Sequence, residues 1–325
     1  MAKKLAVTYH NLSVMLDAGV PLLRSLNTIA SGERPRMRKA FQNLADGVSQ
    51  GNPLAEIMSQ NPKLFNPVDV MLIQAAETSG SLPELIGLLA KWHESSHRTL
   101  RRLRSGMYWP IFILTLAAFV APLPGFILGG WRIGDYLFAI LRILLLFWIP
   151  AGIIILIIRT TPKTGPLRRI LDHIVLRIPL LGNAMYRLAI SRYCWVFHML
   201  CKAGVPITDC MEMSVSATGN AVVGDMFRPA IHSVRAGDSI SRGFSKKLPR
   251  EFMELWRIGE EAGTLDNVTR RLGENNADAA EFSLSEFARW FPRFVYFLVC
   301  VMMIYYIFMN VGRIMTMYGG DLYNW

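Results

Sequence analysis

The chain has 325 residues, which is enough for two compact domains and several membrane-spanning helices. Its hydrophobic residues make up 52% of the composition and are concentrated in three stretches, which indicates an integral membrane protein. The net charge of +11 would suit a nucleic-acid-binding protein, but the basic residues gather beside the apolar stretches. That placement is typical of the cytoplasmic flanks of membrane helices, so we expect no nucleic-acid partner.

Residues 1–105 are predicted to form a first cytoplasmic helical module. No apolar signal sequence follows the first lysines, so the N-terminus is expected to stay in the cytoplasm. Gly19 is expected to end a helix and Pro21 to begin the next one. In a second turn Gly80 supplies a positive φ, while Glu77 binds either the amides of a neighbouring helix start or a cation.

The segment His93–His97 matches H-E-x-x-H, in which two histidines one helical turn apart bind zinc and Glu94 activates water. Lys91 and Arg98 flank it, and no third histidine follows at the spacing of the extended motif. We interpret the segment as a solvated polar helix face. A membrane zinc metalloprotease using His93, Glu94 and His97 is the alternative function.

Residues 106–158 are predicted to form a transmembrane hairpin, because about 20 apolar residues are needed to cross the hydrocarbon. The first span covers about 108–128 and the second about 136–158. Pro122 and Pro124 are expected to kink the outer end of the first span. The link between the spans, Gly129–Asp135, is short and carries a single basic residue, Arg132, so we expect a tight turn on the non-cytoplasmic side.

Residues 159–292 are predicted to form a second cytoplasmic module that repeats the first, at an offset that drifts from 185 to 187 and back to 182. The matched features are AGVPLL at 18–23 with AGVPIT at 203–208, ETSGSLPEL from Glu77 with EEAGTLDNV from Glu260, Gly51 with Gly237, Pro62 and Phe65 with Pro249 and Phe252, and Pro110 with Pro292. The turn residues of the second copy are therefore Gly204, Pro206, Glu260 and Gly263. We predict an all-α fold, in which each module is an antiparallel bundle of short helices.

The second copy does not repeat the histidine motif, since Asn276, Ala277 and Ala280 stand at the matching places. The sequence also contains no phosphate-binding glycine loop, no Walker lysine and no G-x-S-x-G elbow. We expect no catalytic residue, no cofactor and no metal ligand. The eight turn residues of the two copies are instead candidates for partner docking.

Residues 293–325 are predicted to form a third transmembrane helix, at about 294–311, and a short non-cytoplasmic tail. A transporter built from duplicated halves fits this layout poorly. Three spans leave little room for a translocation path, and transporter repeats usually duplicate the spans themselves.

Several of these segments resemble the type II secretion system F domain family. They are L-x-A-G-V-P-L at Leu16–Leu22, G-N-P-L-A-E at Gly51–Glu56, P-x-x-F at Pro62–Phe65, A-E-T-S-G-S-L at Ala76–Leu82 and Tyr108-Trp109-Pro110, with A-G-V-P at Ala203–Pro206, P-x-x-F at Pro249–Phe252 and G-E-E-A-G-T-L at Gly259–Leu265 in the second copy. The resemblance covers nearly the whole chain, in the order in which the family has these motifs.

The resemblance implies a multi-pass platform protein of the bacterial inner membrane in type IV pilus biogenesis or type II secretion. Such a protein couples a hexameric cytoplasmic assembly or secretion ATPase to the polymerisation of pilins or pseudopilins. The partners it implies are that ATPase, the pilins or pseudopilins, other inner-membrane assembly components, the lipid bilayer and further copies of the chain. Both soluble modules would lie in the cytoplasm, and the C-terminus would lie outside it.

Overall fold

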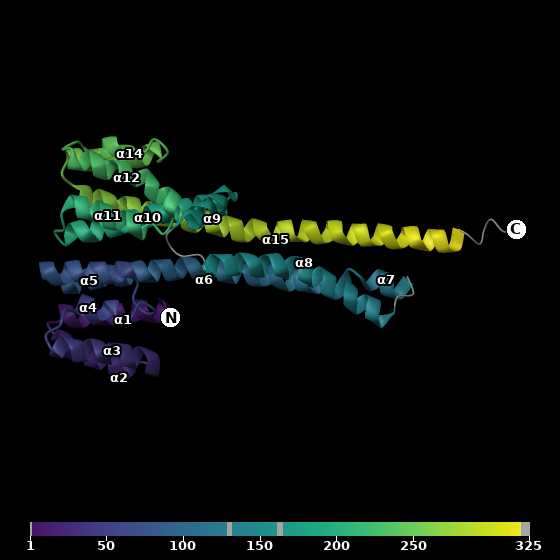
Figure 1. Cartoon of the computed structure of the whole chain (residues 1–325), viewed down its shortest axis with the longest axis horizontal. Coiled ribbons are helices and arrows are strands. Elements are labelled where there is room, and N and C mark those ends of the chain that lie inside the picture. Colours follow the sequence, from purple (N-terminus) through teal and green to yellow (C-terminus); the bar gives the residue numbers. More distant parts are fainter. Residues whose placement is uncertain (1, 129–131, 161–164, 320–325) are drawn as a thin grey trace. The chain divides into compact units, whose positions relative to one another are not determined.

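The computed structural model describes residues 2–128, 132–160 and 165–319, and all the regular elements among them are helices (Figure 1). The predicted all-α class is therefore confirmed. The contacts divide the chain into two units. Unit 1 comprises Met1–Leu100 and Arg168–Ser283, and unit 2 comprises Arg101–Leu167 and Leu284–Trp325.

The first copy of the repeat contributes five short helices and the beginning of a long one to unit 1. The short helices are α1 (Ala2–Asp17), α2 (Leu22–Gly32), α3 (Pro35–Ser49), α4 (Leu54–Ser59) and α5 (Pro67–Ser79). They are followed by α6 (Leu82–Val120), which belongs to unit 1 as far as Leu100. In α2 the buried residues Leu26, Ile29 and Ala30 recur at helical spacing, which gives the helix one apolar face for the core.

The second copy contributes the other half of unit 1. Its helices are α9 (Pro166–Arg177), α10 (Leu181–Lys202), α11 (Ile207–Ala217), α12 (Ala221–Arg235), α13 (Ile240–Gly243), α14 (Arg250–Glu261) and the part of α15 (Leu265–Gly319) that ends at Ser283. Aromatic rings dominate this core. Tyr193 stacks on Phe227 with 3.9 Å between the ring centroids, and Trp256 lies 5.0 Å from Phe197. Such pairs add about 0.5–1.5 kcal/mol each to the effect of area burial.

The repeated P-x-x-F segments occupy different backbone positions in the two copies. Pro62 lies in the loop before α5, whereas Pro249 is the N-cap residue of α14. The two phenylalanines nevertheless make similar contacts. Phe65 meets Phe41 edge-on at 6.2 Å, and Phe252 meets Phe227 edge-on at 5.8 Å. The repeat therefore preserves an aromatic contact in the core where it does not preserve the backbone position.

Unit 2 contains the apolar helices that follow the modules. Helix α6 ends at Val120 and α7 (Leu123–Leu128) begins three residues later, so the helix is interrupted beside the predicted kink at Pro122. Helix α8 (Ile133–Thr160) then packs against this segment, where Ala118, Ala121 and Ile143 are buried together. Its Tyr136 hydroxyl donates a hydrogen bond of 2.9 Å to the Phe119 carbonyl.

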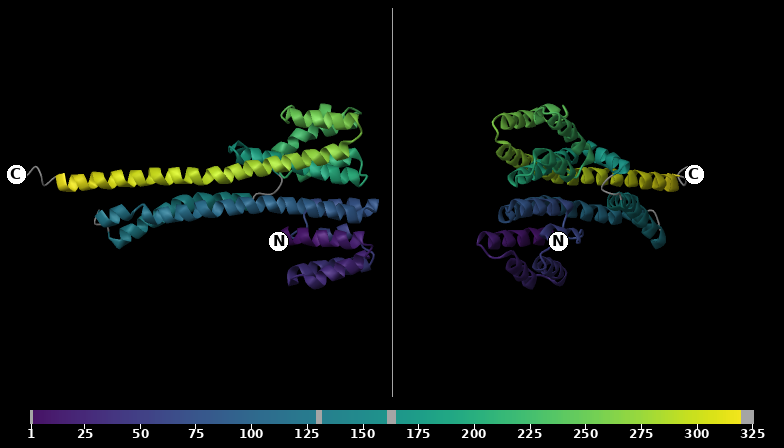
Figure 2. Two further views of the ribbon diagram at one scale, coloured as in Figure 1. Left: turned by 180° about the vertical axis from the view of Figure 1, so that it is seen from behind. Right: turned by 60° about the vertical axis from the view of Figure 1, so that its left-hand side comes forward.

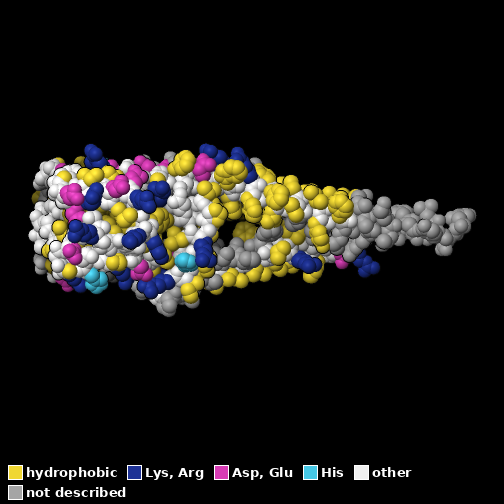
Figure 3. Space-filling model, turned by 90° about the horizontal axis from the view of Figure 1, so that it is seen from above, with side chains coloured by type: hydrophobic (Ala, Val, Ile, Leu, Met, Phe, Trp, Pro, Cys, Tyr) yellow, Lys and Arg dark blue, Asp and Glu magenta, His cyan; other side chains and the backbone are white. Residues whose placement is uncertain are grey.

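Exposed apolar side chains distinguish unit 2 from unit 1. Charged side chains are interspersed over unit 1, whereas the described side chains of unit 2 are mainly apolar (Figure 3). Within the described residues, one helix is long and apolar enough to cross a membrane, at Leu265–Tyr305, where the mean hydropathy reaches 1.5. Figures 1 and 2 show α6 and α15 as long helices without interruption. The number of spans, their orientation and the module boundaries stay predictions.

Tyr193 offers a test of how the aromatic core of the second module is packed. Its hydroxyl is buried without a hydrogen-bond partner among the described residues, whereas the hydroxyl of buried Tyr9 donates to Asp69. A buried polar group without a partner costs about 1–3 kcal/mol. We expect Tyr193→Phe to leave the melting temperature of the full-length protein in detergent unchanged or to raise it, and Tyr9→Phe to lower it. A Tyr193→Phe variant that melts lower than the unmodified protein would contradict this account.

Candidate functional site

The two acidic turns have the same backbone geometry at the ends of α5 and α14. Gly80 adopts φ +71° just after α5, and Gly263 adopts φ +66° just after α14. In the first turn the Ser81 amide donates to the Ala76 carbonyl at 3.0 Å, and in the second the Thr264 amide donates to Gly259 at 2.9 Å. These bonds close the last turn of each helix with a glycine in the left-handed region, which is the usual way to end a helix sharply.

Each turn places a glutamate side chain on the first amides of a short helix. The Glu77 carboxylate accepts from Leu54 N at 2.6 Å and from Ala55 N at 3.0 Å. The Glu260 carboxylate accepts from Ile240 N at 2.5 Å and from Ser241 N at 3.0 Å. The sequence left two roles open for these glutamates, binding the amides of a helix start or binding a cation. In the structure both carboxylates bind the amides of a helix start.

These carboxylates replace the side-chain caps that α4 and α13 lack. The N-cap residues Pro53 and Ser239 make no side-chain hydrogen bond to their helices. The first amides of a helix have no partner inside it, and they lie at the positive end of its dipole. A carboxylate that accepts two of them satisfies both groups and neutralises that end. Hydrogen bonds to a charged group contribute about 1.5–3 kcal/mol each.

The Gly-Val-Pro turns are also built alike in the two copies. Gly19 has φ +77° and Gly204 has φ +74°. Pro21 and Pro206 are the N-cap residues of α2 and α11, with φ of −54° and −52°. Proline fixes φ near −65° and has no amide hydrogen to leave unpaired at a helix start. In each copy, therefore, four residues separate the end of one helix from the beginning of the next.

In the second module a shallow depression with a volume of about 510 Å³ lies beside the acidic turn. Its lining residues come from the helices around both turns and are Cys201, Ile207, Val234, Asp238, Ile240, Glu260, Gly263, Leu265 and Asp266. The depression brings the start of α11, just after Pro206, close to Glu260 and Gly263. The described residues contain no group of three or more His, Cys, Asp or Glu side chains arranged to hold a metal ion.

The prediction of a solvated polar face for the H-E-x-x-H segment is wrong for His93. This histidine is buried, and its Nε2 atom lies 2.9 Å from Oδ1 of the fully buried Asp69 on α5. The Tyr9 hydroxyl donates to Oδ2 of Asp69 at 3.5 Å. Burial, reinforced by the charge of Asp69, raises the pKa of Tyr9 well above its ordinary value. The side chain of His97 lies outside the described residues.

Asp69, which contacts both Tyr9 and His93, was not among the residues predicted from the sequence. Asp69 also forms a capping box with Asn66, because its Oδ2 atom accepts from the Asn66 amide at 3.3 Å. The pattern Asn66-x-x-Asp69 before an apolar run is a readable sign of a helix start. Its pairing with His93 is a contact between helices that this local pattern does not contain. The first histidine of the motif thus binds a carboxylate in the core of the first module.

Comparison with known proteins finds a match over both copies of the repeat. A family model described as "Type II secretion system (T2SS), protein F" matches residues 8–129 and residues 193–312. The two matches begin 185 residues apart, which is the offset of the Gly-Val-Pro turns.

Individual relatives cover most of the chain at low identity. The type IV pilus assembly protein PilC of Pseudomonas aeruginosa is 27% identical over 300 residues, which are 82% of this chain and 77% of that protein. PilC of Thermus thermophilus is 26% identical over 307 residues, 87% of this chain and 75% of its own. The type II secretion system protein F of Vibrio cholerae is 24% identical over 301 residues, 86% of this chain and 74% of its own.

Removing the acidic caps provides a stability test. Glu77→Gln retains one acceptor oxygen and turns an amide donor toward a main-chain amide, so we expect a loss of about 1–3 kcal/mol. For a domain of this size that loss lowers the melting temperature by about 2–4 °C per kcal/mol. Glu260→Gln should behave in the same way. Differential scanning fluorimetry of the full-length protein in detergent measures the shift.

The matched control is Glu56→Gln, which changes an exposed carboxylate in the first turn of α4. It should leave the melting temperature within about 2 °C of the unmodified protein, because exposed substitutions change stability by roughly 0.5 kcal/mol at most. Equal shifts for Glu56→Gln and Glu77→Gln would show that only the general charge near α4 matters.

Proposed function

The chain belongs to the type II secretion system protein F family, and on this basis we propose that it is a non-catalytic platform protein of the bacterial inner membrane. It couples a cytoplasmic assembly ATPase to the polymerisation of pilins or pseudopilins. The observation that carries this proposal is the match of the family model to both copies of the repeat, in the same order and over most of the chain. The relatives take part, by name, in type IV pilus assembly or in type II secretion.

The construction of the modules supports a mechanical role. Main-chain amides hold the glutamate side chains at both acidic turns, so the short helices α4 and α13 are fixed to α5 and α14. Boundaries between unit 1 and unit 2 in the sequence fall inside helices α6 and α15, and neither helix is interrupted there. Short helices that are fixed in this way make each module a firm scaffold, which suits a protein that passes on the work of an ATPase.

The distribution of charge supports the proposed topology. Basic residues precede the first and third apolar stretches and follow the second, as expected for cytoplasmic flanks. We propose three spans, with the N-terminus and both modules in the cytoplasm and the C-terminus outside. We place the third span in the apolar part of α15, at about 294–311, and the candidate spanning helix at Leu265–Tyr305 overlaps the beginning of this range.

The metalloprotease alternative has no support from the environment of His93. His93 is buried in the core beside Asp69, and the described residues contain no group of three or more His, Cys, Asp or Glu side chains arranged to hold a metal ion. Glu94 is exposed at the surface. The proposed function therefore assigns no catalytic role to either residue.

Complementation tests the platform role and the protease role together. Deleting the gene in its host should abolish surface pili or the secretion of the type II substrates, and the unmodified gene should restore them. Glu94→Gln should restore them equally well, because a platform protein needs no general base at that position. A Glu94→Gln variant that inserts in the membrane but fails to complement would favour the protease. Full assembly in the deletion strain would overturn the platform role.

The topology has its own test. Alkaline phosphatase, which is active only outside the cytoplasm, should be active when fused after Trp325 and inactive when fused after Ser283. Green fluorescent protein, which folds in the cytoplasm, should give the opposite pattern. Phosphatase activity after Ser283 would place the second module outside the cytoplasm and would overturn the coupling to a cytoplasmic ATPase.

A further inference from the structure

The contact between the two modules in unit 1 joins faces that are not equivalent. Helix α5 of the first copy packs against α10 and α11 of the second. In the repeat α10 and α11 correspond to α1 and α2, since each pair surrounds a Gly-Val-Pro turn. Helix α5 corresponds to α14, since each carries the capping glutamate. The internal contact is therefore heterologous: one face of the module meets a different face of its copy.

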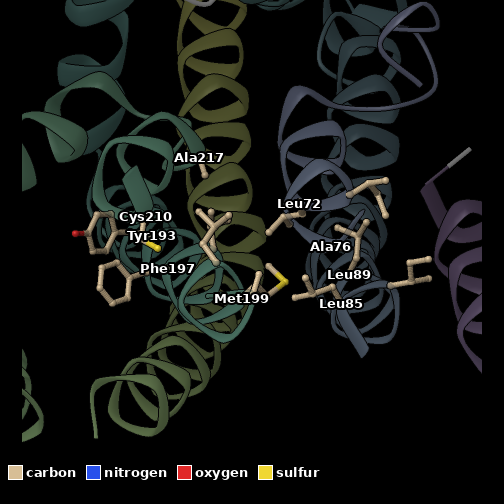
Figure 4. Packing of buried hydrophobic residues seen from close by; sticks show 14 of the residues in the cluster. Leu72, Ala76, Leu85, Leu89, Tyr193, Phe197, Met199, Cys210 and Ala217 are labelled. Atoms are coloured by element: carbon tan, nitrogen blue, oxygen red, sulfur yellow. The ribbon is translucent and has the colours of Figure 1, made fainter. Parts of the chain in front are cut away.

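Apolar side chains fill this internal contact. Leu72 on α5 is 1% exposed and Met199 on α10 is fully buried. Figure 4 shows Met199 opposite Leu85 and Leu89 of the first module. Lys202 at the end of α10 forms an ion pair with Glu84 beside these residues. The contact thus combines a closed apolar centre with one charge pair.

Two apolar residues of the internal contact have exposed counterparts on the outer faces, whereas Leu272, the counterpart of Leu89, is buried. Leu72 lies five residues before Glu77, and the residue five before Glu260 is Leu255, which is 37% exposed. Ile258 on the same helix is 54% exposed. Met199 lies four residues before Ala203, and the residue four before Ala18 is Val14, which is 52% exposed.

These residues belong to two faces that we name by helix. The α14 face contains Leu255 and Ile258, and the α1 face contains Val14. Within the described part of unit 1, no contact like that of α5 with α10 and α11 joins α14 to α1 or α2. In each chain, therefore, α14 and α1 lack the contact that their counterparts α5 and α10 make with each other.

We propose that a second copy of the chain covers these faces, so that the α14 face of one molecule docks on the α1 face of the next. The internal contact supplies the template, because it joins the corresponding faces of the same module. Burying Leu255, Ile258 and Val14 removes apolar surface from water, which contributes about 25 cal/mol per Å². The inference concerns assembly alone, and it holds whether or not the chain couples to an ATPase.

The charges at the edge of the two faces permit this contact. Asp17 stands at the position of Lys202, so the cation of the internal contact is replaced by an anion. At the position of Glu84 stands Asn267, which carries no charge. Had only the first change occurred, two carboxylates would face each other. The paired change avoids that repulsion between neighbouring molecules.

A heterologous contact between identical chains repeats from one molecule to the next. It produces a closed ring when the rotation between neighbours closes, and an open helical array when it does not. An isologous dimer, by contrast, would place like faces against each other. The two arrangements differ in which pairs of residues meet, and cross-linking distinguishes them.

The experiment uses two full-length variants with different affinity tags, Val14→Cys and Leu255→Cys, reconstituted together in liposomes. A short bismaleimide should give cross-linked dimers that carry both tags, at a yield several-fold above that of the unmodified chains. The unmodified chains set the background because they contain four native cysteines. Either variant alone should remain at the background.

Two results would overturn the proposal. Mixed-tag dimers at the background level would show that the α14 and α1 faces do not meet. Cross-linking of Val14→Cys with itself, or of Leu255→Cys with itself, as efficient as in the mixture would show that like faces meet, and thus an isologous contact.

A second measurement tests the energetic role of the α14 face. The double variant Leu255→Glu with Ile258→Glu should weaken self-association at least tenfold, as measured by mass photometry of the detergent-solubilised protein. Its matched control is Ile170→Glu with Ile174→Glu, which alters two exposed isoleucines on α9, outside both faces. Circular dichroism verifies that both variants are folded. Equal self-association of the two variants would contradict the proposal.

Discussion

The contact between a glutamate carboxylate and two main-chain amides is the constraint on which each module depends. Helices α4 and α13 have six and four residues, far below the length at which an isolated helix is stable in water. Their first amides need acceptors, and Pro53 and Ser239 supply none from their side chains. The glutamate in the last turns of α5 or α14 supplies them. The glycine that follows ends the longer helix there, so that the carboxylate lies at its end.

The two copies keep this frame but fill their cores differently. The first core contains the polar group of Tyr9, Asp69 and His93. In the second, Asn276 stands at the position of His93 and donates to the carbonyl of Leu272 in its own helix. Aromatic contacts around Trp256 take the place of the pair between helices. Buried polar groups must be stripped of water and need a hydrogen-bond partner, whereas aromatic packing has no such cost. The repeat therefore constrains turns and helix ends more tightly than it constrains the core.

The sequence predicts those features that depend on neighbouring residues. The role of Gly80 and Gly263 at helix ends can be predicted from the sequence, because a sharp helix end requires a positive φ at a single residue. The partner of Glu77 cannot be predicted in this way. Leu54 lies 23 residues earlier and donates its main-chain amide, a group that nearly every residue type has. His93 was misread for a related reason. Charged residues beside it in the sequence indicated a surface position, but the pairing with Asp69 is made between helices.

The glutamate contacts also determine where the modules can vary in length. Leu54 and Glu77 are 23 positions apart in the first copy, and Ile240 and Glu260 are 20 positions apart in the second. The entropy of closing these loops differs by only about 0.1 kcal/mol. Because both ends of each segment are held, three residues can be gained or lost in the short helix and the loop that follows it without displacing α5 or α14. The loop after each short helix can therefore change in length and sequence during evolution while the surrounding helices stay in place.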